Sequence, residues 1–369
     1  MDNIDLSIVV PLYNGKQYIK ETVEELLKIE CRKEILIIDD GSTDGSYEYC
    51  MKLWGDNSDI KLFTKQNSGI VDTRNFGLKN SNGQYLFFSD QDDISYPEVI
   101  DAAIKNAEDK CLDGVLWSTV RLLEKNQTVS CDTVYNDEIV TKTEITNSFI
   151  PRMLINSANE KVSYLGHVWA GIYRRDIVEK NNINFKRFVD IEDDYLFVFD
   201  FLIAANTLGL MHRTGYAWRF NQKSETYRLK YIDNILEKYI KFYRYLSQCV
   251  NGYKFSEQGL SKFLTYQIQN TLVMSIENSF TYLNKSKTDK REIKKYYLQN
   301  KKYFILNSVF EYEKRRKRIY LCLKHGMFCI AASYVYLDSM YRWLKNQIIS
   351  CTMRLLLSIK KLMIAKNGD

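Results

Sequence analysis

Short apolar runs alternate with amphipathic segments through the first 120 residues, and this alternation constrains the fold more than any other feature. The apolar runs have the length and the aromatic and β-branched content of buried strands, and they lie at 6–10, 35–38, 60–63, 85–88 and 115–117. Helix-like segments separate them, at 16–29, 44–54, 70–79 and from Pro97 onward. Strands and helices in regular alternation predict an α/β domain with a mostly parallel central sheet.

The second half of the chain has a different pattern. Residues 169–178 predict a strand and a short helix, 191–205 predict a helix, and most of the remainder has a helical period. A chain of 369 residues is long enough for more than one compact unit. We expect an α/β domain over 1–225, a helical region over 226–313 and a basic, amphipathic helical tail over 314–369.

Polar clusters follow three of the predicted strands, at the point where each strand ends. They are Pro11-Leu12-Tyr13-Asn14, Asp39-Asp40-Gly41-Ser42 and Asp90-Gln91-Asp92-Asp93. Ligands of open parallel sheets bind outside the carboxyl ends of the strands, so we expect these clusters to share one site. A carboxylate after the second strand is suited to accept a hydrogen bond from a base or ribose, and a helix cap is its alternative role. The Tyr13 ring is suited to stack on a base, and ordinary packing is its alternative role. Together the clusters predict a nucleotide pocket.

Three carboxylates crowd the turn after the strand at 85–88. Folding alone gives little reason to place Asp90, Asp92 and Asp93 together, because like charges repel; a solvated, Asp-rich loop is the alternative. A divalent cation resolves the repulsion, since Mg²⁺ or Mn²⁺ is usually held by one or two carboxylates plus substrate phosphates. The presence of only three histidines argues against a zinc site.

Two absent motifs narrow the class of nucleotide protein. The sequence contains neither a G-x-x-x-x-G-K-[ST] loop nor a G-x-G-x-x-G turn after the first predicted strand. The first absence excludes a P-loop NTPase, and the second disfavours a Rossmann dehydrogenase. Without a glycine-rich backbone to hold a diphosphate, a cation at the Asp-rich turn is expected to hold it.

Four segments in the same order, 7–14, 37–46, 67–77 and 83–93, resemble the family 2 glycosyltransferases. The resemblance implies a GT-A fold, a UDP-sugar donor and Mg²⁺ or Mn²⁺ as cofactor. It implies that Asp40 binds the base, that Tyr13 stacks on it and that Arg74 lies near the nucleotide. The implied nucleotide-sugar site comprises Pro11, Tyr13, Asp39, Asp40, Arg74, Asp90, Trp169 and Arg219, with Trp169 facing the sugar and Arg219 approaching the diphosphate. Asp92 and Asp93 are the implied metal ligands, although Asp90 fits that role as well.

A second acidic cluster, Glu192-Asp193-Asp194, opens the helix predicted at 191–205. It resembles the family's second acidic motif, which implies that Asp193 is the general base for the acceptor hydroxyl and that Glu192 orients the acceptor or the base. Asp194 is the alternative base, and charge at a helix N-terminus is the structural alternative. The Gln-x-x-Arg-Trp motif of processive members is absent, so we expect transfer of a single sugar.

The last part of the chain is strongly basic. Residues 314–368 contain twelve Lys and Arg residues and one acid, Asp338, whereas the whole chain has a net charge of +6. Its longest apolar run, 327–337, is too short to span a bilayer. Basic residues interleaved with aromatics predict an amphipathic segment on an anionic membrane surface. A solvated charged face and nucleic-acid binding are the alternatives, and the acidic remainder of the chain favours a membrane over nucleic acid.

The eight cysteines are scattered and the N-terminus lacks a basic signal-peptide region, which predicts a cytoplasmic protein, peripheral on the inner face of the cell membrane. We expect an inverting, metal-dependent glycosyltransferase that moves one sugar to a lipid-linked or oligosaccharide acceptor in cell-surface or capsular polysaccharide synthesis. The helical region offers surface for a homodimer. A nucleotidyltransferase and a non-catalytic, membrane-docked scaffold are the alternatives.

Overall fold

The computed structural model describes residues 4–123, 127–130, 135–155, 166–188, 193–219, 231–250, 257–281, 287–304 and 314–342. The contacts within the chain divide it into two compact units. The first comprises Met1–Asn156, Glu160–Leu229 and Gly252–Lys254, and the second comprises Ser157–Asn159, Lys230–Asn251 and Phe255–Asp369.

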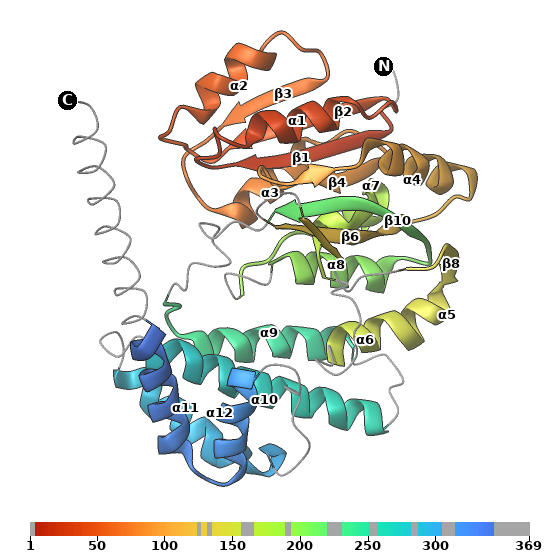
Figure 1. The fold of residues 1–369 in the computed structure, drawn as a ribbon. Coiled ribbons are helices and arrows are strands. Elements are labelled where there is room, and N and C mark those ends of the chain that lie inside the picture. The colour runs from red at the N-terminus through yellow and green to blue at the C-terminus, as the bar shows by residue number, and fades with distance from the viewer. Residues whose placement is uncertain are drawn as a thin grey trace, which may run out of the picture. The chain divides into compact units, whose positions relative to one another are not determined.

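Within the described residues, the first unit is built on one ten-stranded sheet (Figure 1). The strands are β1 (Leu6–Leu12), β2 (Lys33–Asp39), β3 (Ile60–Thr64), β4 (Tyr85–Phe88), β5 (Ile94–Ser95), β6 (Gly114–Leu123), β7 (Gln127–Ser130), β8 (Glu138–Thr141), β9 (Gly171–Arg174) and β10 (Thr207–Arg219). Their order is β3-β2-β1-β4-β9-β6-β10-β5, with β7 beside β6 and β8 beside β10. Strands β1 to β4 pair in parallel, as do β6 and β10, whereas β9 runs antiparallel to β4 and β6. The predicted mostly parallel α/β sheet is confirmed.

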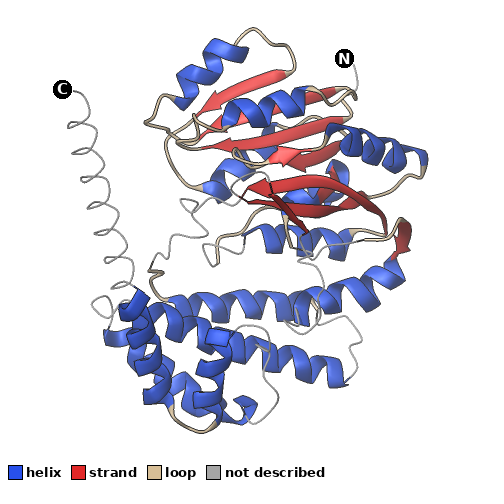
Figure 2. Ribbon diagram, viewed as in Figure 1, coloured by secondary structure: helices blue, strands red, loops and turns tan. Residues whose placement is uncertain are grey.

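Helices cover both faces of this sheet (Figure 2). They are α1 (Ile19–Leu27), α2 (Ser46–Trp54), α3 (Ile70–Asn80), α4 (Pro97–Asp109), α5 (Lys142–Glu144), η1 (Ile145–Phe149), α6 (Ile150–Ile155), η2 (Val168–Ala170), α7 (Arg175–Lys180) and α8 (Asp193–Ala204). The helices expected after the first, second, third and fourth strands are therefore present, with ends that differ by a few residues.

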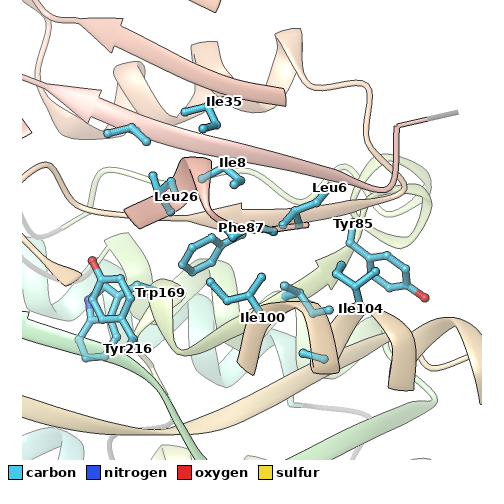
Figure 3. Close-up of a cluster of buried hydrophobic side chains, with 14 of the residues drawn as sticks. Leu6, Ile8, Leu26, Ile35, Tyr85, Phe87, Ile100, Ile104, Trp169 and Tyr216 are labelled. Carbon is cyan, nitrogen blue, oxygen red and sulfur yellow. The ribbon is translucent and has the colours of Figure 1, made fainter. Parts of the chain in front are cut away.

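Strand β1 is buried on both faces, so its alternate side chains pack into two separate layers. Ile8 lies in a cluster with Leu26 of α1 and Ile100 of α4 (Figure 3). Val9 points to the opposite face, where its Cγ1 lies 2.3 Å from where a Cβ on Gly77 would stand. Glycine at position 77 thus allows α3 to approach β1 closely, which sets the position of the α3 N-terminus at the carboxyl edge of the sheet.

The second unit is helical in the part that the structure describes. Its elements are α9 (Ile235–Cys249), α10 (Glu257–Thr281), α11 (Lys287–Asn300), η3 (Lys301–Phe304), α12 (Lys314–Lys324) and a further helix over 328–342. Buried side chains from all six of these elements, including Ile276, Ile293, Leu323 and Val335, form one core. Residues 314–342, which the sequence groups with the basic tail, therefore contribute to the core of this unit. No helix among the described residues is long and apolar enough to cross a bilayer.

Candidate functional site

The loop after β1 is tied to the Asp-rich turn after β4. Gln91 makes a reciprocal pair of bonds with Tyr13: its Oε1 accepts the Tyr13 backbone N–H at 2.8 Å, and its Nε2 donates to the Tyr13 carbonyl at 3.1 Å. Tyr13 itself is 48% exposed, so its ring is open to a ligand. Pro11 lies inside β1 and is buried, so it shapes the strand end. The expected convergence of the first and third polar clusters is present in this geometry.

The loop after β1 also joins the loop after β2. Asn14 has a left-handed backbone, with φ of 49°, and its N–H donates to Ser42 Oγ at 2.9 Å. Its side-chain oxygen accepts the Thr43 N–H at 2.8 Å. Asn tolerates this backbone region better than most residues, because its short polar side chain can bond locally. Three strand-end loops are thereby held at one edge of the sheet.

Asp39 and Asp40 are buried and engaged with the protein. Asp39 accepts the Ser42 N–H and the Thr64 hydroxyl, at 3.2 and 3.1 Å to Oδ2. Asp40 accepts the N–H groups of Ser68 and Gly69, at 2.9 and 2.8 Å, and pairs with Lys65. Asp40 thus holds the two residues that directly precede α3, a different helix from the one that follows Asp40 in the chain. Both carboxylates therefore brace the loops at the carboxyl edge of the sheet.

The three aspartates of the turn after β4 have different environments. Asp93 is 5% exposed, and its carboxylate accepts the Tyr216 hydroxyl at 2.9 Å and the Arg219 N–H at 2.7 Å. Burial, reinforced by the charges of Asp90 and Asp92, raises the pKa of Asp93 well above its usual range. Asp90 keeps a third of its side-chain surface exposed, and Asp92 is half-buried. The geometry gives Asp93 an anchoring role and leaves Asp90 and Asp92 nearer to solvent.

Tyr216 of β10 completes this anchor. Its hydroxyl donates to Asp93 and accepts the Asp90 N–H at 3.0 Å, so a single oxygen joins both ends of the turn. The Tyr216 ring stacks on Trp169 at 4.8 Å, and the other side of Trp169 carries His167 at 4.4 Å (Figure 3 shows the Trp169–Tyr216 pair). Trp169 is only 6% exposed, so it supports the Tyr216 ring, and through it the turn, from inside the protein. Burial lowers the pKa of His167 to about 4, which keeps this ring neutral at pH 7.

Arg74 joins the two acidic motifs. Its NH2 donates to Asp90 Oδ1 at 2.9 Å, and its NH1 donates to Asp194 of α8. The guanidinium is 5% exposed and lies 5.5 Å over the Phe185 ring. Asn75 fixes Phe185 through a reciprocal pair of bonds, at 2.9 and 3.0 Å, to the Phe185 backbone. A buried cation on α3 therefore brings the turn after β4 to the first turn of α8.

The remaining predicted residues lie around these contacts or outside the described residues. Arg219 ends β10 and donates to the Asp92 carbonyl at 3.0 Å and to Glu21 at 2.7 Å. Asp193 is the first residue of α8, and it directly precedes Asp194, the residue on α8 that pairs with Arg74. Glu192 lies outside the described residues. Sequence reasoning did not identify Gln91 or Tyr216 as site residues, because their roles depend on β10 and the loop after β1 lying beside the turn.

The site has carboxylate oxygens of the kind that bind a divalent cation together with phosphate oxygens. Among the residues that the structure describes, no three His, Cys, Asp or Glu side chains gather as a ready-made metal cage. Mg²⁺ does not need one, because it keeps several waters and binds one or two carboxylates together with substrate phosphates. Asp90 and Asp92, on one turn and reachable from solvent, fit this requirement.

Comparison with known proteins identifies the domain that carries the site. The model of "Glycosyl transferase family 2" matches residues 7–181, which span the sheet edge and the turn after β4. Residues 7–181 form a glycosyl transferase family 2 domain. The chain is 24% identical over 322 residues to the uncharacterized glycosyltransferase EpsJ of Bacillus subtilis (strain 168), covering 86% of this chain and 91% of EpsJ. It is 25% identical over 264 residues to the cholesterol galactosyltransferase of Borreliella burgdorferi, covering 68% of this chain and 71% of that protein.

Solved structures agree with this assignment at the level of the fold. The crystal structure of S. aureus TarS 1-349 in complex with UDP-GlcNAc superposes with a TM-score of 0.62 at 20% identity, covering 92% of each chain. The expected GT-A fold with a helical C-terminal region is confirmed, and so is the expectation of a glycosyltransferase.

Proposed function

We propose that this family 2 glycosyltransferase transfers a single sugar, with inversion, from a UDP-sugar to a lipid-linked or oligosaccharide acceptor in cell-surface polysaccharide synthesis. The observation that carries the proposal is the Arg74 bridge between Asp90, at the carboxyl edge of the sheet, and Asp194, at the start of α8. A transferase needs its donor and its acceptor base within reach of each other, and this bridge links the two motifs that the family resemblance assigns to them.

The donor half of the site is the edge formed by the loops after β1, β2 and β4. The exposed Tyr13 ring is suited to stack on uracil, and Asp90 is suited to accept a ribose hydroxyl. The TarS crystal structure contains UDP-GlcNAc, and its similar fold supports a UDP-linked donor here. Arg219, beside the Asp92 carbonyl, is the candidate for contact with the diphosphate.

We assign Asp92, with Asp90, as the residues that would hold Mg²⁺ or Mn²⁺. A bound cation would neutralise the diphosphate as a Lewis acid and make it a better leaving group. Asp93 has both carboxylate oxygens bonded within the protein, so we assign it the positioning of the turn instead. This choice sharpens the sequence prediction, which left the three aspartates unresolved.

Asp193 is the proposed general base. The acceptor oxygen forms a bond to the anomeric carbon while the bond from that carbon to the diphosphate oxygen breaks. The hydroxyl proton passes to the Asp193 carboxylate, and UDP leaves with the electron pair. Asp194, held by Arg74, fixes the first turn of α8 and so the place from which the base acts. Glu192 is proposed to orient the acceptor.

The acceptor is proposed to be attached to a lipid. The cholesterol galactosyltransferase of Borreliella burgdorferi is named for a lipid acceptor, and the basic C-terminal part of this chain suits an anionic membrane surface on the cytoplasmic side. We propose peripheral association and no nucleic-acid partner.

The test is release of UDP from a panel of UDP-sugars, with membrane extract as the source of acceptor. Asp193→Asn is expected to abolish acceptor-dependent release while UDP still raises the melting temperature. Asp176→Asn, which changes a half-buried acid on α7, is the matched control and should release UDP as the wild type does. Full acceptor-dependent activity in Asp193→Asn would remove the proposed base.

A further inference from the structure

Large apolar side chains are exposed mainly in one short part of the chain. Of the twelve that are exposed among the described residues, seven lie between positions 321 and 341, namely Leu321, Met327, Ile330, Tyr336, Leu337, Met340 and Tyr341. Folded monomers rarely gather exposed apolar residues in this way unless something covers them. The interior of this region is already complete, since Leu323, Phe328, Ala331 and Val335 are buried in the core of the helical unit.

The exposed residues form a stripe on the helix over 328–342. Ile330, Leu337 and Tyr341 follow one another at helical spacing, and they are 54, 53 and 64% exposed. Met340 is exposed at the border of this face. The opposite face holds the buried residues, so the helix is apolar on both sides. We call this exposed face, Ile330 to Tyr341, the apolar stripe.

Cations border the apolar stripe. Helix α12 runs alongside the helix over 328–342, because Arg315 pairs with Asp338 at 3.0 Å and Arg318 lies 5.9 Å over the Tyr334 ring. The turn that joins the two helices contains Gly326, where an added Cβ would lie 3.3 Å from Lys301 Nζ. The outer face of α12 presents Lys314, Lys317, Arg318 and Lys324, all exposed. Among the described residues, this exposed apolar face thus has positive charge along its side and at its turn.

We infer that this two-helix surface, residues 314–342, docks on an anionic lipid surface. The apolar stripe would enter the boundary between head groups and acyl chains, while the α12 lysines remain at the level of the lipid phosphates. Lysine suits this arrangement, because its aliphatic stem can lie on apolar surface while the ammonium stays in the polar layer.

Charge decides between a membrane and a second copy of the chain. Residues 314–342 contain seven basic residues and one acid, Asp338, and that acid already pairs with Arg315 and Arg342. A symmetric contact through the apolar stripe would bring two basic α12 faces together with no acidic partner, whereas anionic head groups supply the opposite charge.

The inference does not depend on sugar transfer, so it is tested with the full chain and vesicles alone. Co-sedimentation is measured with phosphatidylcholine vesicles, with and without phosphatidylglycerol. We expect binding only to the anionic vesicles, weakened by salt. Ile330→Glu with Leu337→Glu, and separately Lys317→Glu with Lys324→Glu, should each weaken it at least about tenfold.

Two control pairs lie in the α/β unit. Met51→Glu with Leu53→Glu matches the apolar change at exposed positions, and Lys79→Glu with Lys105→Glu matches the charge change. Both pairs should bind vesicles as the wild type does, apart from a small general effect of charge. Melting curves with and without UDP show whether each variant is folded. If the variant with the two stripe substitutions does not fold, vesicle binding by the variant with the two lysine substitutions tests the inference.

Three results would overturn the inference. The first is a wild-type chain that does not bind anionic vesicles. The second is unchanged binding in both the stripe pair and the lysine pair, which would assign the membrane contact to another part of the chain. The third is a wild-type dimer, seen by light scattering, that the stripe pair converts to a monomer while vesicle binding persists.

Discussion

The carboxyl edge of the sheet and the two-helix surface at 314–342 differ in the kind of side chain that they leave exposed. At the sheet edge, Asp39, Asp40 and Asp93 are buried and bonded by backbone N–H groups and side chains, whereas Asp90, which pairs with Arg74, and Asp92 remain partly exposed. At the two-helix surface the core is filled, yet Ile330, Leu337 and Tyr341 remain exposed. The two regions thus expose opposite chemistry: carboxylates at the sheet edge, and apolar side chains bordered by cations at the two-helix surface.

The largest expected effect breaks the sheet edge at its central cation. Arg74→Met removes the cation that pairs with both Asp90 and Asp194, and removal of one partner of a buried ion pair costs about 3 kcal/mol of unfolding free energy or more. Transfer should fall by roughly 100-fold or more, because the proposed base and the proposed donor site lose their common support. Arg187→Met, which removes an exposed pair with Asp72, is the control and should leave both quantities nearly unchanged. Equal effects in the two variants would contradict the bridging role.

A smaller effect is expected at the hydroxyl that anchors the Asp-rich turn. Tyr216→Phe leaves the Asp90 N–H and the Asp93 carboxylate without this partner, at a cost of about 2 kcal/mol. UDP affinity should fall with stability. Tyr173→Phe removes a buried hydroxyl that has no hydrogen-bond partner among the described residues, so its melting temperature should be unchanged or higher. If the two variants melt alike, the Tyr216 hydroxyl is not an anchor.

Acid denaturation tests a carboxyl group that supports the sheet and lies outside the candidate site. Burial opposes ionisation of Glu34, but bonds from Lys61, Ser7 and Asn82 outweigh it and leave the pKa of this carboxyl lowered. A carboxyl with a lowered folded-state pKa stabilises the fold above its unfolded pKa of about 4.3, and that stability is lost as the pH falls through the folded pKa. The denaturant midpoint of the wild type should therefore drop below about pH 4.3, and Glu34→Gln should reduce that dependence. If the denaturant midpoint of Glu34→Gln falls at low pH as steeply as that of the wild type, the stabilising role of the Glu34 carboxylate is contradicted.

The smallest effect is expected on the apolar stripe in the absence of lipid. Leu337→Ser changes a side chain that is 53% exposed, so the melting temperature should shift by the equivalent of about 0.5 kcal/mol or less. Leu323→Ala, on a side chain with no exposure, should lower the stability of the helical unit by about 2–5 kcal/mol. A large loss in Leu337→Ser would mean that part of this chain already covers the stripe.

The sequence predicts the α/β unit well because strand and helix periods are local signals. The apolar runs at 6–10, 35–38, 60–63 and 85–88 all lie in strands, and the Asp-rich turn follows β4 as expected. Strand β9 also lies within the segment 169–178 that predicts a strand, but its antiparallel insertion between β4 and β6 has no local signature, because strand order depends on contacts between distant segments.

The same distinction applies to the site. The acidic motifs are local and visible in the sequence, whereas the Arg74 bridge, the Tyr216 anchor and the burial of Trp169 depend on packing between α3, α8 and β10. A pattern of three aspartates also does not reveal that one of them, Asp93, points into the protein. In the C-terminal part, charge pattern predicts a surface segment, but only the fold divides 314–342 into a core face and an exposed face.

The central claim is that Asp90 and Asp92 bind a nucleotide diphosphate through a divalent cation, and melting temperature tests it most directly. A ligand that binds only the folded state raises this temperature by mass action. We predict that UDP stabilises the wild type strongly with Mn²⁺ and weakly without it, and that Asp92→Ala loses the Mn²⁺-dependent part. Stabilisation by UDP that ignores both Mn²⁺ and Asp92→Ala, or no stabilisation at all, would contradict the account.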